Sequence, residues 1–189
     1  MINQMIRVSD VLISILVLII FLPIMIIISL FILVIDGKPI IYKQFRVGYM
    51  GRQFIIFKFR TMSNTIFKDE KLRLSLLGKI LRKTSLDEMP QFINVLNKDM
   101  SIVGPRPLPK IIENKINRTI RVKRRQILPG ITGMSQINYS GKNRKLGDKI
   151  KLDMQFINNY TVYNYYKILI KTPIILIARF FKNKSSIIK

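Results

Sequence analysis

Residues 11–35 read VLISILVLIIFLPIMIIISLFILVI, and this uncharged stretch decides how the rest of the chain is arranged. Its 25 residues exceed the ~18 that indicate a membrane helix. The stretch is too long for the core of a signal peptide and lacks a small-residue cleavage site, so we expect it to be retained. Lys and Arg are in excess on its C-terminal side, which predicts that this side is cytoplasmic.

Pro23 divides the stretch into two apolar halves. A straight helix of this length would extend about 37 Å, enough to cross the ~30 Å hydrocarbon core, whereas each half alone reaches only about 18 Å. Proline removes a helical hydrogen bond and favours a kink, although membrane-spanning helices tolerate it. The residues leave two geometries open: a span, which they favour slightly, and a re-entrant hairpin with both ends on one face.

The composition restricts the partners and the chemistry. A chain of 189 residues with a net charge of +23 predicts one domain and an anionic partner, such as nucleic acid, anionic lipid headgroups or a phosphorylated substrate. A mean hydropathy of +0.24 argues against a plain soluble nucleic-acid binder. The chain has no Cys and no His, so any catalysis must use carboxylates, Lys, Arg, Tyr, Ser, Thr or a metal.

The remaining sequence predicts an α+β domain that is mostly helical. Alternating β-branched and aromatic residues over 40–62 predict a small β-hairpin. Apolar periodicity predicts helices over 68–83, 85–96, 111–127 and 149–163, and an interfacial helix over 165–181. Residues 104–109 predict a rigid Pro-rich connector, and residues 128–138 a turn followed by a strand.

Asp87 and Glu88 stand side by side in a chain that has only 10 Asp+Glu against 33 Lys+Arg. One interpretation is structural: Ser85 and Glu88 fit a capping box at a helix start. That interpretation does not explain Arg82 just upstream, or Arg106, which is held between two prolines. A backbone fixed in this way suits a phosphate clamp better than a solvated charge.

Carboxylates beside phosphate-binding cations indicate two kinds of chemistry. A carboxylate pair can hold Mg²⁺, which prefers one or two carboxylates together with substrate phosphates. One carboxylate can also attack phosphorus and form an acyl phosphate. A chain without histidine can complete such a reaction if the second nucleophile is a phosphate monoester, which is already ionised. A lipid phosphate would also explain the membrane segment.

Four motifs carry a resemblance to a known family. KFRTM (58–62), LRKTSLDEMPQ (81–91), NVLNKDMSIVGPRPL (94–108) and RQILPGITGMSQIN (125–138), in this order and spacing, resemble the bacterial sugar transferases. These are small monotopic polyprenyl-phosphate phosphoglycosyl transferases. The similarity covers nearly the whole chain, and the length is that expected of a minimal catalytic form.

The resemblance implies a monotopic, membrane-associated α+β fold. Residues 1–36 would form a re-entrant membrane helix broken at Pro23, which reverses the preference for a span. Residues 37–189 would form a compact catalytic domain on the cytoplasmic face of the bacterial inner membrane, with an interfacial segment at 165–181. The expected partners include anionic inner-membrane lipids and exclude nucleic acid, and the oligomeric state is left open, with a homodimer among the options.

The resemblance also implies the reaction and its residues. A phospho-sugar would pass from a UDP-sugar to undecaprenyl phosphate with release of UMP, by a ping-pong mechanism, as the first membrane step of glycan assembly. Asp87 matches the nucleophile and Glu88 its Mg²⁺-associated partner, so both are expected at the metal. The residues expected to bind substrate or phosphate are Lys58, Arg60, Arg82, Arg106 and Asp153.

Some positions depart from the family pattern, and two other functions remain as alternatives. Met134 replaces a common Trp, while Asn64 and Asn164 replace frequent Asp residues, which bears on specificity. The sequence identifies neither the sugar nor the pathway. A membrane-tethered basic binding module would use the charge and the anchor but not the Asp87–Glu88 pair. An inactive scaffold of a glycan-assembly complex is the other alternative, which the departures allow and the intact pair argues against. UMP release from a UDP-sugar separates them from the enzyme.

Overall fold

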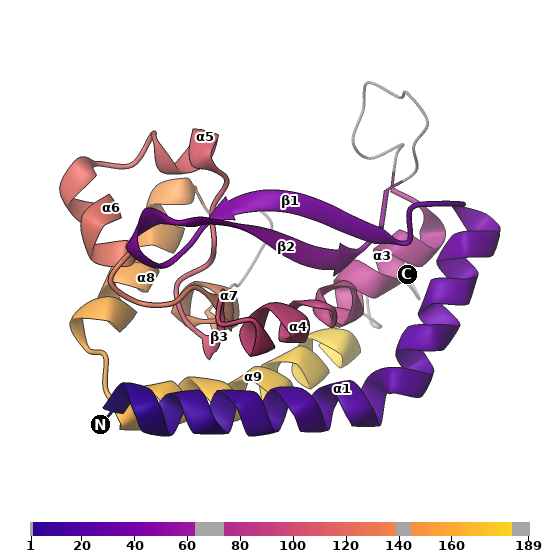
Figure 1. Ribbon diagram of the computed structural model, residues 1–189, viewed down its shortest axis with the longest axis horizontal. Helices are drawn as coiled ribbons and strands as arrows, with labels where there is room; N and C mark the ends of the chain where they lie inside the picture. The colour runs from indigo at the N-terminus through magenta and orange to yellow at the C-terminus, as the bar shows by residue number, and fades with distance from the viewer. Residues whose placement is uncertain (1, 63–73, 139–144, 183–189) are drawn as a thin grey trace.

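The computed structural model describes residues 2–62, 74–138 and 145–182, and within them the fold is mixed and rich in helix, as the sequence predicts (Figure 1). The elements, with two short 3₁₀ turns η1 and η2, are α1 (Ile2–Ile35), β1 (Ile41–Val47), η1 (Tyr49–Gly51), β2 (Gln53–Phe59), α3 (Leu76–Thr84), η2 (Leu86–Glu88), α4 (Gln91–Leu96), β3 (Ser101–Val103), α5 (Lys110–Glu113), α6 (Arg118–Arg124), β4 (Gly130–Thr132), α7 (Met134–Ile137), α8 (Leu146–Asn158) and α9 (Val162–Lys182).

Helix α1 runs along one side of the molecule and then bends to run up its end (Figure 1). Pro23 is the proline inside this helix, and a proline removes a backbone hydrogen bond and kinks a helix. Most large apolar side chains of α1 are exposed, and among the described residues it is the one helix long and apolar enough to cross a membrane. A surface of this kind is not stable in water and indicates a lipid environment.

A buried polar anchor fastens the first turns of α1 to the rest of the protein. Asp10 is 1% exposed and accepts hydrogen bonds from Ser101 Oγ (2.7 Å), the Ile102 amide (3.1 Å) and the Tyr165 hydroxyl. One turn earlier, Arg7 donates to the carbonyl oxygen of Leu96 (3.1 Å). The start of α1 is therefore bonded to the end of α4, to β3 and to α9.

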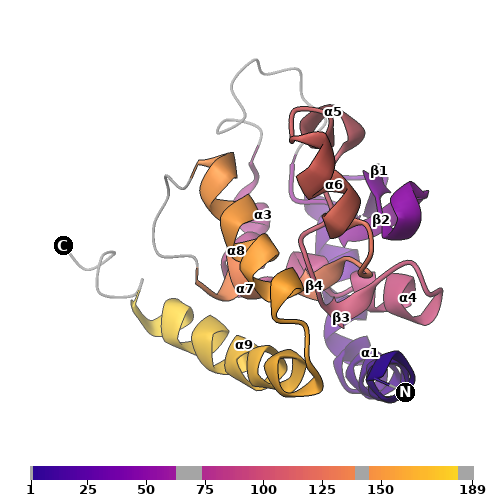
Figure 2. The same ribbon diagram turned by 90° about the vertical axis from the view of Figure 1, so that its left-hand side faces the viewer.

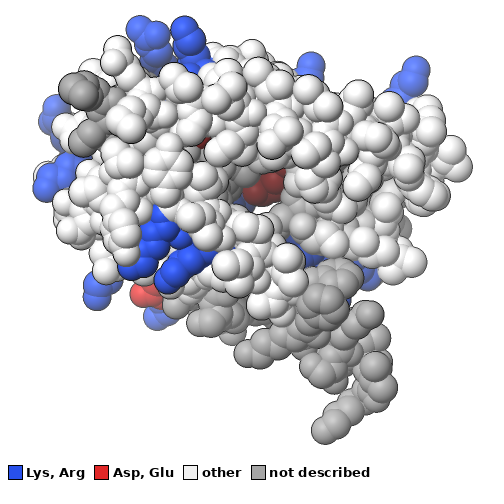
Figure 3. Space-filling model, turned by 90° about the horizontal axis from the view of Figure 1, so that it is seen from below, with Lys and Arg blue, Asp and Glu red and all other residues white. Residues whose placement is uncertain are grey.

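Helices α1 and α9 lie beside each other along one face of the molecule (Figures 1 and 2). Ile170, Ile174 and Ile177 of α9 are exposed, as are most large apolar side chains of α1. Figure 3 shows that this face is largely uncharged, with Lys and Arg near its edges and a hollow near its middle that has acidic atoms on its floor. The predicted helix over 165–181 is confirmed as the main part of α9.

The predicted hairpin is confirmed as the antiparallel pair β1–β2. Its register pairs Gln44 with Ile56 and Tyr42 with Lys58. Because alternate residues of a strand point to opposite faces, Gln44 and Arg46 share one face of the hairpin with Ile56 and Lys58. The turn at its tip uses positive φ angles, 52° at Met50 and 80° at Gly51.

Two glycines allow the Pro-rich connector to press against the later glycine motif. β3 and β4 form a short parallel pair that the sequence does not predict, and Gly104 N donates to Thr132 O (2.9 Å) while Gly130 N donates to Pro105 O (3.0 Å). A Cβ at Gly130 would lie 2.0 Å from Gly104 N. The two motifs are therefore one structural unit, and this unit fixes the loop that carries Arg106.

Three predicted helices are wrong in their extent. The helix expected over 85–96 is η2 followed by α4, because Pro90 has no N–H to donate to Leu86 O and the helix restarts after it. The helix expected over 111–127 is α5 and α6, with Asn117 capping the second through its side chain, 2.9 Å from Thr119 N. The helix expected over 149–163 is α8, which ends at Asn158.

The helix predicted over 68–83 lies partly outside the described residues, as does Asn64. Its described part is α3, which begins at Leu76 because Leu74 is extended and bridges Met62. Ser75 caps this helix by accepting a hydrogen bond from Gly78 N (2.9 Å). Residues 128–138 contain the predicted strand, β4, and also the short helix α7, which begins at Met134.

We predict that Gly130→Ala lowers the free energy of unfolding by at least about 2 kcal/mol, because the added methyl would overlap rigid backbone. Gly147→Ala is the matched control: Gly147 lies in α8, and a Cβ added there would have no neighbouring atom within 4 Å, so this change should stabilise by up to ~1 kcal/mol. Thermal denaturation of the two solubilised variants measures the difference. Equal midpoints would show that the two loops do not depend on this close approach.

Candidate active site

Asp87 and Glu88 lie on a single 3₁₀ turn, η2, between α3 and α4. Ser85 ends α3 in the left-handed conformation, with φ 59°, and its side chain makes no capping hydrogen bond. The capping box predicted for Ser85 and Glu88 is therefore wrong, because a residue in this conformation serves as the end of one helix rather than the start of the next.

The turn is supported from below by the second half of α1. Leu86 and Met89, which flank the two acids, pack against the buried cluster that contains Ile28 and Ile32 of α1. The same cluster includes Leu81 of α3 and Phe59 of β2. The apolar residues of the turn thus point toward the membrane helix, and this leaves the carboxylates to the polar side.

Asp87 and Glu88 differ in electrostatic state although they are adjacent. Burial first, and then the charge of Glu88, raise the pKa of Asp87 to about 6, against the opposing effects of Lys58 and Arg82. Burial also acts to raise the pKa of Glu88, but Arg106 and Lys58 outweigh it and hold that pKa below its ordinary value. Glu88 is thus a stable anion, and Asp87 is a more basic carboxylate.

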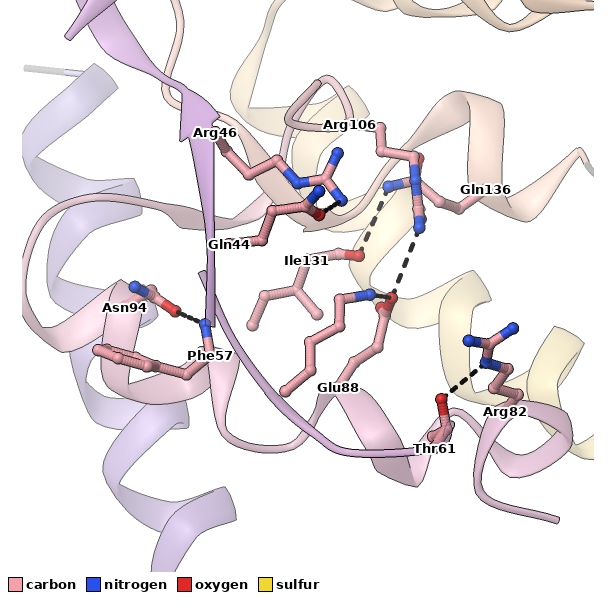
Figure 4. Close-up of polar contacts among 11 residues, drawn as sticks. Gln44, Arg46, Phe57, Thr61, Arg82, Glu88, Asn94, Arg106, Ile131 and Gln136 are labelled. Atoms are coloured by element: carbon pink, nitrogen blue, oxygen red, sulfur yellow. Dashed lines mark hydrogen bonds and ion pairs between the residues drawn. The ribbon is translucent and has the colours of Figure 1, made fainter. Parts of the chain in front are cut away.

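The cations come from two different elements (Figure 4). Lys58, on β2, forms an ion pair with Glu88 Oε1, and Arg106, in the loop after β3, places its Nη2 3.7 Å from the same oxygen. The side chain of Arg106 is 45% exposed, whereas those of Lys58 and Glu88 are 16% and 19% exposed. Arg106 is therefore the more accessible of the two cations.

Arg82 reaches the site from α3. Its Nε donates to Thr61 Oγ1 (2.9 Å), which joins α3 to the segment that directly follows β2 (Figure 4). The contact is possible because α3 lies against Thr61 at Gly78, where a Cβ would be 2.0 Å from Thr61 O. Lys58, Arg82, Glu88 and Arg106, all predicted from the motifs, are thus assembled around one turn together with Asp87.

Asn94 is a structural residue of the site that sequence reasoning missed. This fully buried side chain accepts from Phe57 N (3.1 Å) and donates to Ile55 O (2.7 Å), so it joins α4 to β2 (Figure 4). Lys58 follows directly on this strand, and Glu88 precedes α4 by one short turn. The amide therefore fixes the distance between the two partners of the ion pair. The one signal in the sequence is an asparagine among the apolar residues of a predicted helix.

Asp153 has a supporting position rather than one facing a substrate. It is 2% exposed and forms an ion pair with Arg124, whose other nitrogen donates to the backbone oxygen of Arg106 (2.8 Å). The predicted phosphate contact of Asp153 does not agree with this burial. Its carboxylate instead fixes the backbone of the loop that presents Arg106, through Arg124.

Arg60 forms its hydrogen bonds with backbone carbonyl groups rather than with the two acids. Its guanidinium donates to the carbonyl oxygens of Asp36, Gly37 and Lys38, directly after α1, and the residue is 5% exposed. These bonds hold the segment that follows α1 against the end of β2. They assign Arg60 a structural role that the motif alone does not distinguish from phosphate binding.

The two acids fit a shared rather than a self-contained metal site. Among the described residues, no group of three or more Asp, Glu, His or Cys side chains could hold a metal ion. Mg²⁺, however, is commonly bound by one or two carboxylates together with substrate phosphates. No ion pair reaches Asp87 within the described part of the chain, so its carboxylate remains available to a cation that arrives with a diphosphate.

The chain is similar to known proteins over most of its length. The family model described as bacterial sugar transferase matches residues 2–179. The uncharacterized sugar transferase EpsL of Bacillus subtilis is 38% identical over 148 residues, which cover 72% of this chain and 69% of the relative.

Two longer relatives are named by their reactions. The UDP-glucose:undecaprenyl-phosphate glucose-1-phosphate transferase of Klebsiella pneumoniae is 34% identical, and the undecaprenyl-phosphate galactose phosphotransferase of Salmonella typhimurium is 36% identical. The alignments cover 95% and 92% of this chain but 41% and 40% of the relatives, so the chain spans about two fifths of their length. A family-model match over nearly the whole sequence shows that this chain belongs to the bacterial sugar transferase family.

Proposed function

We propose that this protein transfers a sugar phosphate from a UDP-sugar to undecaprenyl phosphate and releases UMP. The observation that carries the proposal is the turn η2, where a carboxylate with a raised pKa lies beside one held ionised by two cations. The names of the two longer relatives specify undecaprenyl phosphate as acceptor and differ in the sugar, glucose in one and galactose in the other. The proposal therefore covers the reaction and leaves the sugar open.

In the first step, Asp87 attacks the β-phosphorus of the UDP-sugar. A bond forms between its carboxylate oxygen and phosphorus, the bond from phosphorus to the bridging oxygen breaks, and the electron pair leaves with UMP. With a pKa near 6, Asp87 is mostly ionised at neutral pH and more basic than an ordinary carboxylate, which favours attack. The turn fixes the carboxylate, so little orientation is lost at the moment of reaction.

Two anions that approach a diphosphate would repel it unless cations are present. Lys58 and Arg106 neutralise Glu88, and Arg82 adds positive charge on the side of Asp87. Asp87 and Glu88 are the residues that would hold Mg²⁺, which would supply charge neutralisation for the departing phosphate. In many enzymes, positive groups fixed in advance around a developing negative charge make the largest single contribution to stabilisation of the transition state.

In the second step, the phosphate of the lipid attacks the phosphorus held on Asp87. The bond between that phosphorus and the carboxylate oxygen breaks, which regenerates Asp87 and gives undecaprenyl-diphospho-sugar. A phosphate monoester is already ionised at neutral pH, so this step needs no strong general base. The reaction is therefore compatible with a sequence that contains no histidine.

The contacts of α1 support a re-entrant rather than a spanning geometry. Ile6 and Asp10 near its start are buried against β3 and α9, while Ile28 and Ile32 near its end are buried against α3 and η2. Both halves thus pack on the same body of protein. Pro23 lies between these two contacts, as expected of a segment that enters and leaves the bilayer on one face.

The face formed by α1 and α9 supports access of the lipid from the membrane. It is largely uncharged at its centre, carries Lys and Arg toward its edges and contains the hollow with acidic atoms on its floor (Figure 3). Cations near an anionic bilayer contribute roughly 1 kcal/mol each to attraction. A domain lying flat on the cytoplasmic leaflet would thus place this hollow at the membrane surface, where a lipid phosphate can reach it.

We predict that Asp87→Asn abolishes turnover and leaves the fold intact, because the amide cannot attack phosphorus. A reaction quenched without lipid acceptor should show wild-type protein heavier by one phospho-sugar, with the modified peptide containing Asp87. Mass spectrometry of the intact protein and of its peptides measures both. Glu88→Gln should retain a trace of the adduct, because the nucleophile is still present.

Two results would contradict this assignment. A rate of Asp87→Asn close to that of the wild type would remove Asp87 as the nucleophile. A phospho-sugar adduct on another residue would show that this other residue is the nucleophile. If no UDP-sugar from a broad panel yields UMP in the presence of Mg²⁺ and undecaprenyl phosphate, the transferase proposal itself fails and a membrane-tethered binding module gains support.

We predict that kcat/KM for the UDP-sugar falls about tenfold per pH unit below about pH 6. The sign follows from the raised pKa: Asp87 must be ionised to attack, and a raised pKa means that it becomes protonated at a higher pH than an ordinary carboxylate. In Glu88→Gln, the loss of the neighbouring charge should move this limb to lower pH, although the maximum rate falls. A limb near pH 4 in the wild type would contradict the assignment.

We predict that both ends of α1 face the cytoplasm. The chain has no Cys, so single substitutions give clean labels. In intact spheroplasts, Gln4→Cys should resist a membrane-impermeant thiol reagent as fully as Lys110→Cys, an exposed control on the catalytic domain, and both should react after lysis. Labelling at position 4 from outside, with position 110 protected, would show that α1 spans the membrane.

A further inference from the structure

Arg46 is a cation of the active site that none of the four motifs contains. It lies on β1, and the register of the hairpin puts it on the same face as Lys58. Its side chain lines the same small pocket as Lys58, Glu88 and Arg106. This pocket therefore holds three cations and a single carboxylate, and such an excess of positive charge favours an anionic ligand.

The guanidinium of Arg46 is held in place by one hydrogen bond, but its Nε has no hydrogen-bond acceptor among the described residues. One of its terminal nitrogens donates to Gln44 Oε1, from the same strand (Figure 4). Its Nε is buried, and among the described residues no group accepts a hydrogen bond from it. Burial, and then the charge of Arg106, lower the pKa of Arg46, yet a guanidinium stays protonated in proteins. A buried charged donor of this kind is stable when a ligand completes its bonding.

The charged groups of the site form an ordered row. Lys58 and Arg82 lower the pKa of Asp87, Arg106 and Lys58 lower that of Glu88, and Arg106 and Glu88 act in opposite directions on that of Arg46. Figure 4 shows the same order, with Arg82 and Thr61 at one end, Glu88 between, and Arg46 with Gln44 at the other. A diphosphate whose reacting phosphorus lies at Asp87 would extend its second phosphate beyond Glu88, toward Arg106 and Arg46.

We infer that Arg46, oriented by Gln44, binds the phosphate that leaves with the nucleoside. This inference rests on the proposed transfer reaction and assigns Arg46 to its first half. When the bond between the β-phosphorus and the bridging oxygen breaks, the electron pair stays on that oxygen, which becomes part of UMP. The planar fork of an arginine can donate two hydrogen bonds to such a phosphate. Arg46 therefore binds the phosphate of UMP in the first half-reaction. The second half-reaction, in which the lipid phosphate attacks, does not require Arg46.

The first experiment measures binding, which does not require turnover. UMP and uridine are titrated by calorimetry against the wild-type protein, Arg46→Gln, Arg46→Lys and Arg52→Gln, all full-length in nanodiscs with Mg²⁺. Arg52 is the matched control, since it is an exposed arginine at the tip of the same hairpin. Arg46→Gln should weaken UMP binding about 10- to 100-fold, with a smaller loss in Arg46→Lys, no change in Arg52→Gln, and no change in uridine binding for any variant.

The second experiment separates the two half-reactions. Without lipid acceptor, the burst of UMP from UDP-sugar should be about 100-fold slower in Arg46→Gln than in the wild type. Once the phospho-sugar adduct has formed and free UDP-sugar has been removed, its decay on addition of undecaprenyl phosphate should stay within about 3-fold of the wild-type rate. Equal thermal midpoints of the wild-type and variant proteins show that the fold is intact.

Three outcomes would overturn the inference. Unchanged UMP binding in Arg46→Gln would remove the contact, and an equal loss of UMP and uridine binding would place it at the nucleoside rather than the phosphate. A normal UMP burst with slow decay of the adduct would assign Arg46 to the lipid phosphate instead. If the wild-type protein forms no adduct with any UDP-sugar, the transferase proposal fails, and the binding comparison still decides whether Arg46 holds a nucleotide phosphate.

Discussion

The packing of the apolar helix α1 against the turn η2 is the contact on which the rest of the candidate site depends. Ile28 and Ile32 of α1 lie in one buried cluster with Leu86 and Met89, so the residues on either side of Asp87 and Glu88 are held by this helix. Apolar contacts alone have little directional preference. The orientation of the turn comes from hydrogen bonds around these contacts. Arg60 bonds the carbonyl groups that follow α1, Arg82 bonds Thr61, and Asn94 joins α4 to β2.

Electrostatic balance gives the two neighbouring acids different properties. Both are withdrawn from water, which alone would raise the pKa of each, but the cations are distributed unevenly. Lys58 and Arg106 meet the carboxylate of Glu88, and no ion pair reaches Asp87 in the described part of the chain. Two identical functional groups one residue apart can thereby take separate roles, one as a fixed charge and one as a reactive base.

The sequence predicts the long-range plan better than the local boundaries. The apolar helix, the hairpin and the assembly of Lys58, Arg82 and Arg106 around the acids follow from hydropathy, alternation and motif order. The capping box at Ser85 is wrong because a helix end and a helix start have similar composition. The β3–β4 pair was not predicted because each strand has three residues and its partner lies far along the chain. Arg46 lies outside the four motifs, and only the register of the hairpin brings it to the same face as Lys58.

The anchor at Asp10 has a consequence for the order in which the protein is made. Tyr165, which donates to its carboxylate, is 155 residues later in the chain, and Ser101 is 91 residues later. The helix that carries Asp10 is synthesised before either donor. Until they arrive, the carboxylate must remain where water or headgroups can solvate it, because an unpaired charge in hydrocarbon is costly. The bonding of Asp10 is therefore completed late in synthesis, when Tyr165 of α9 has followed α1 out of the ribosome.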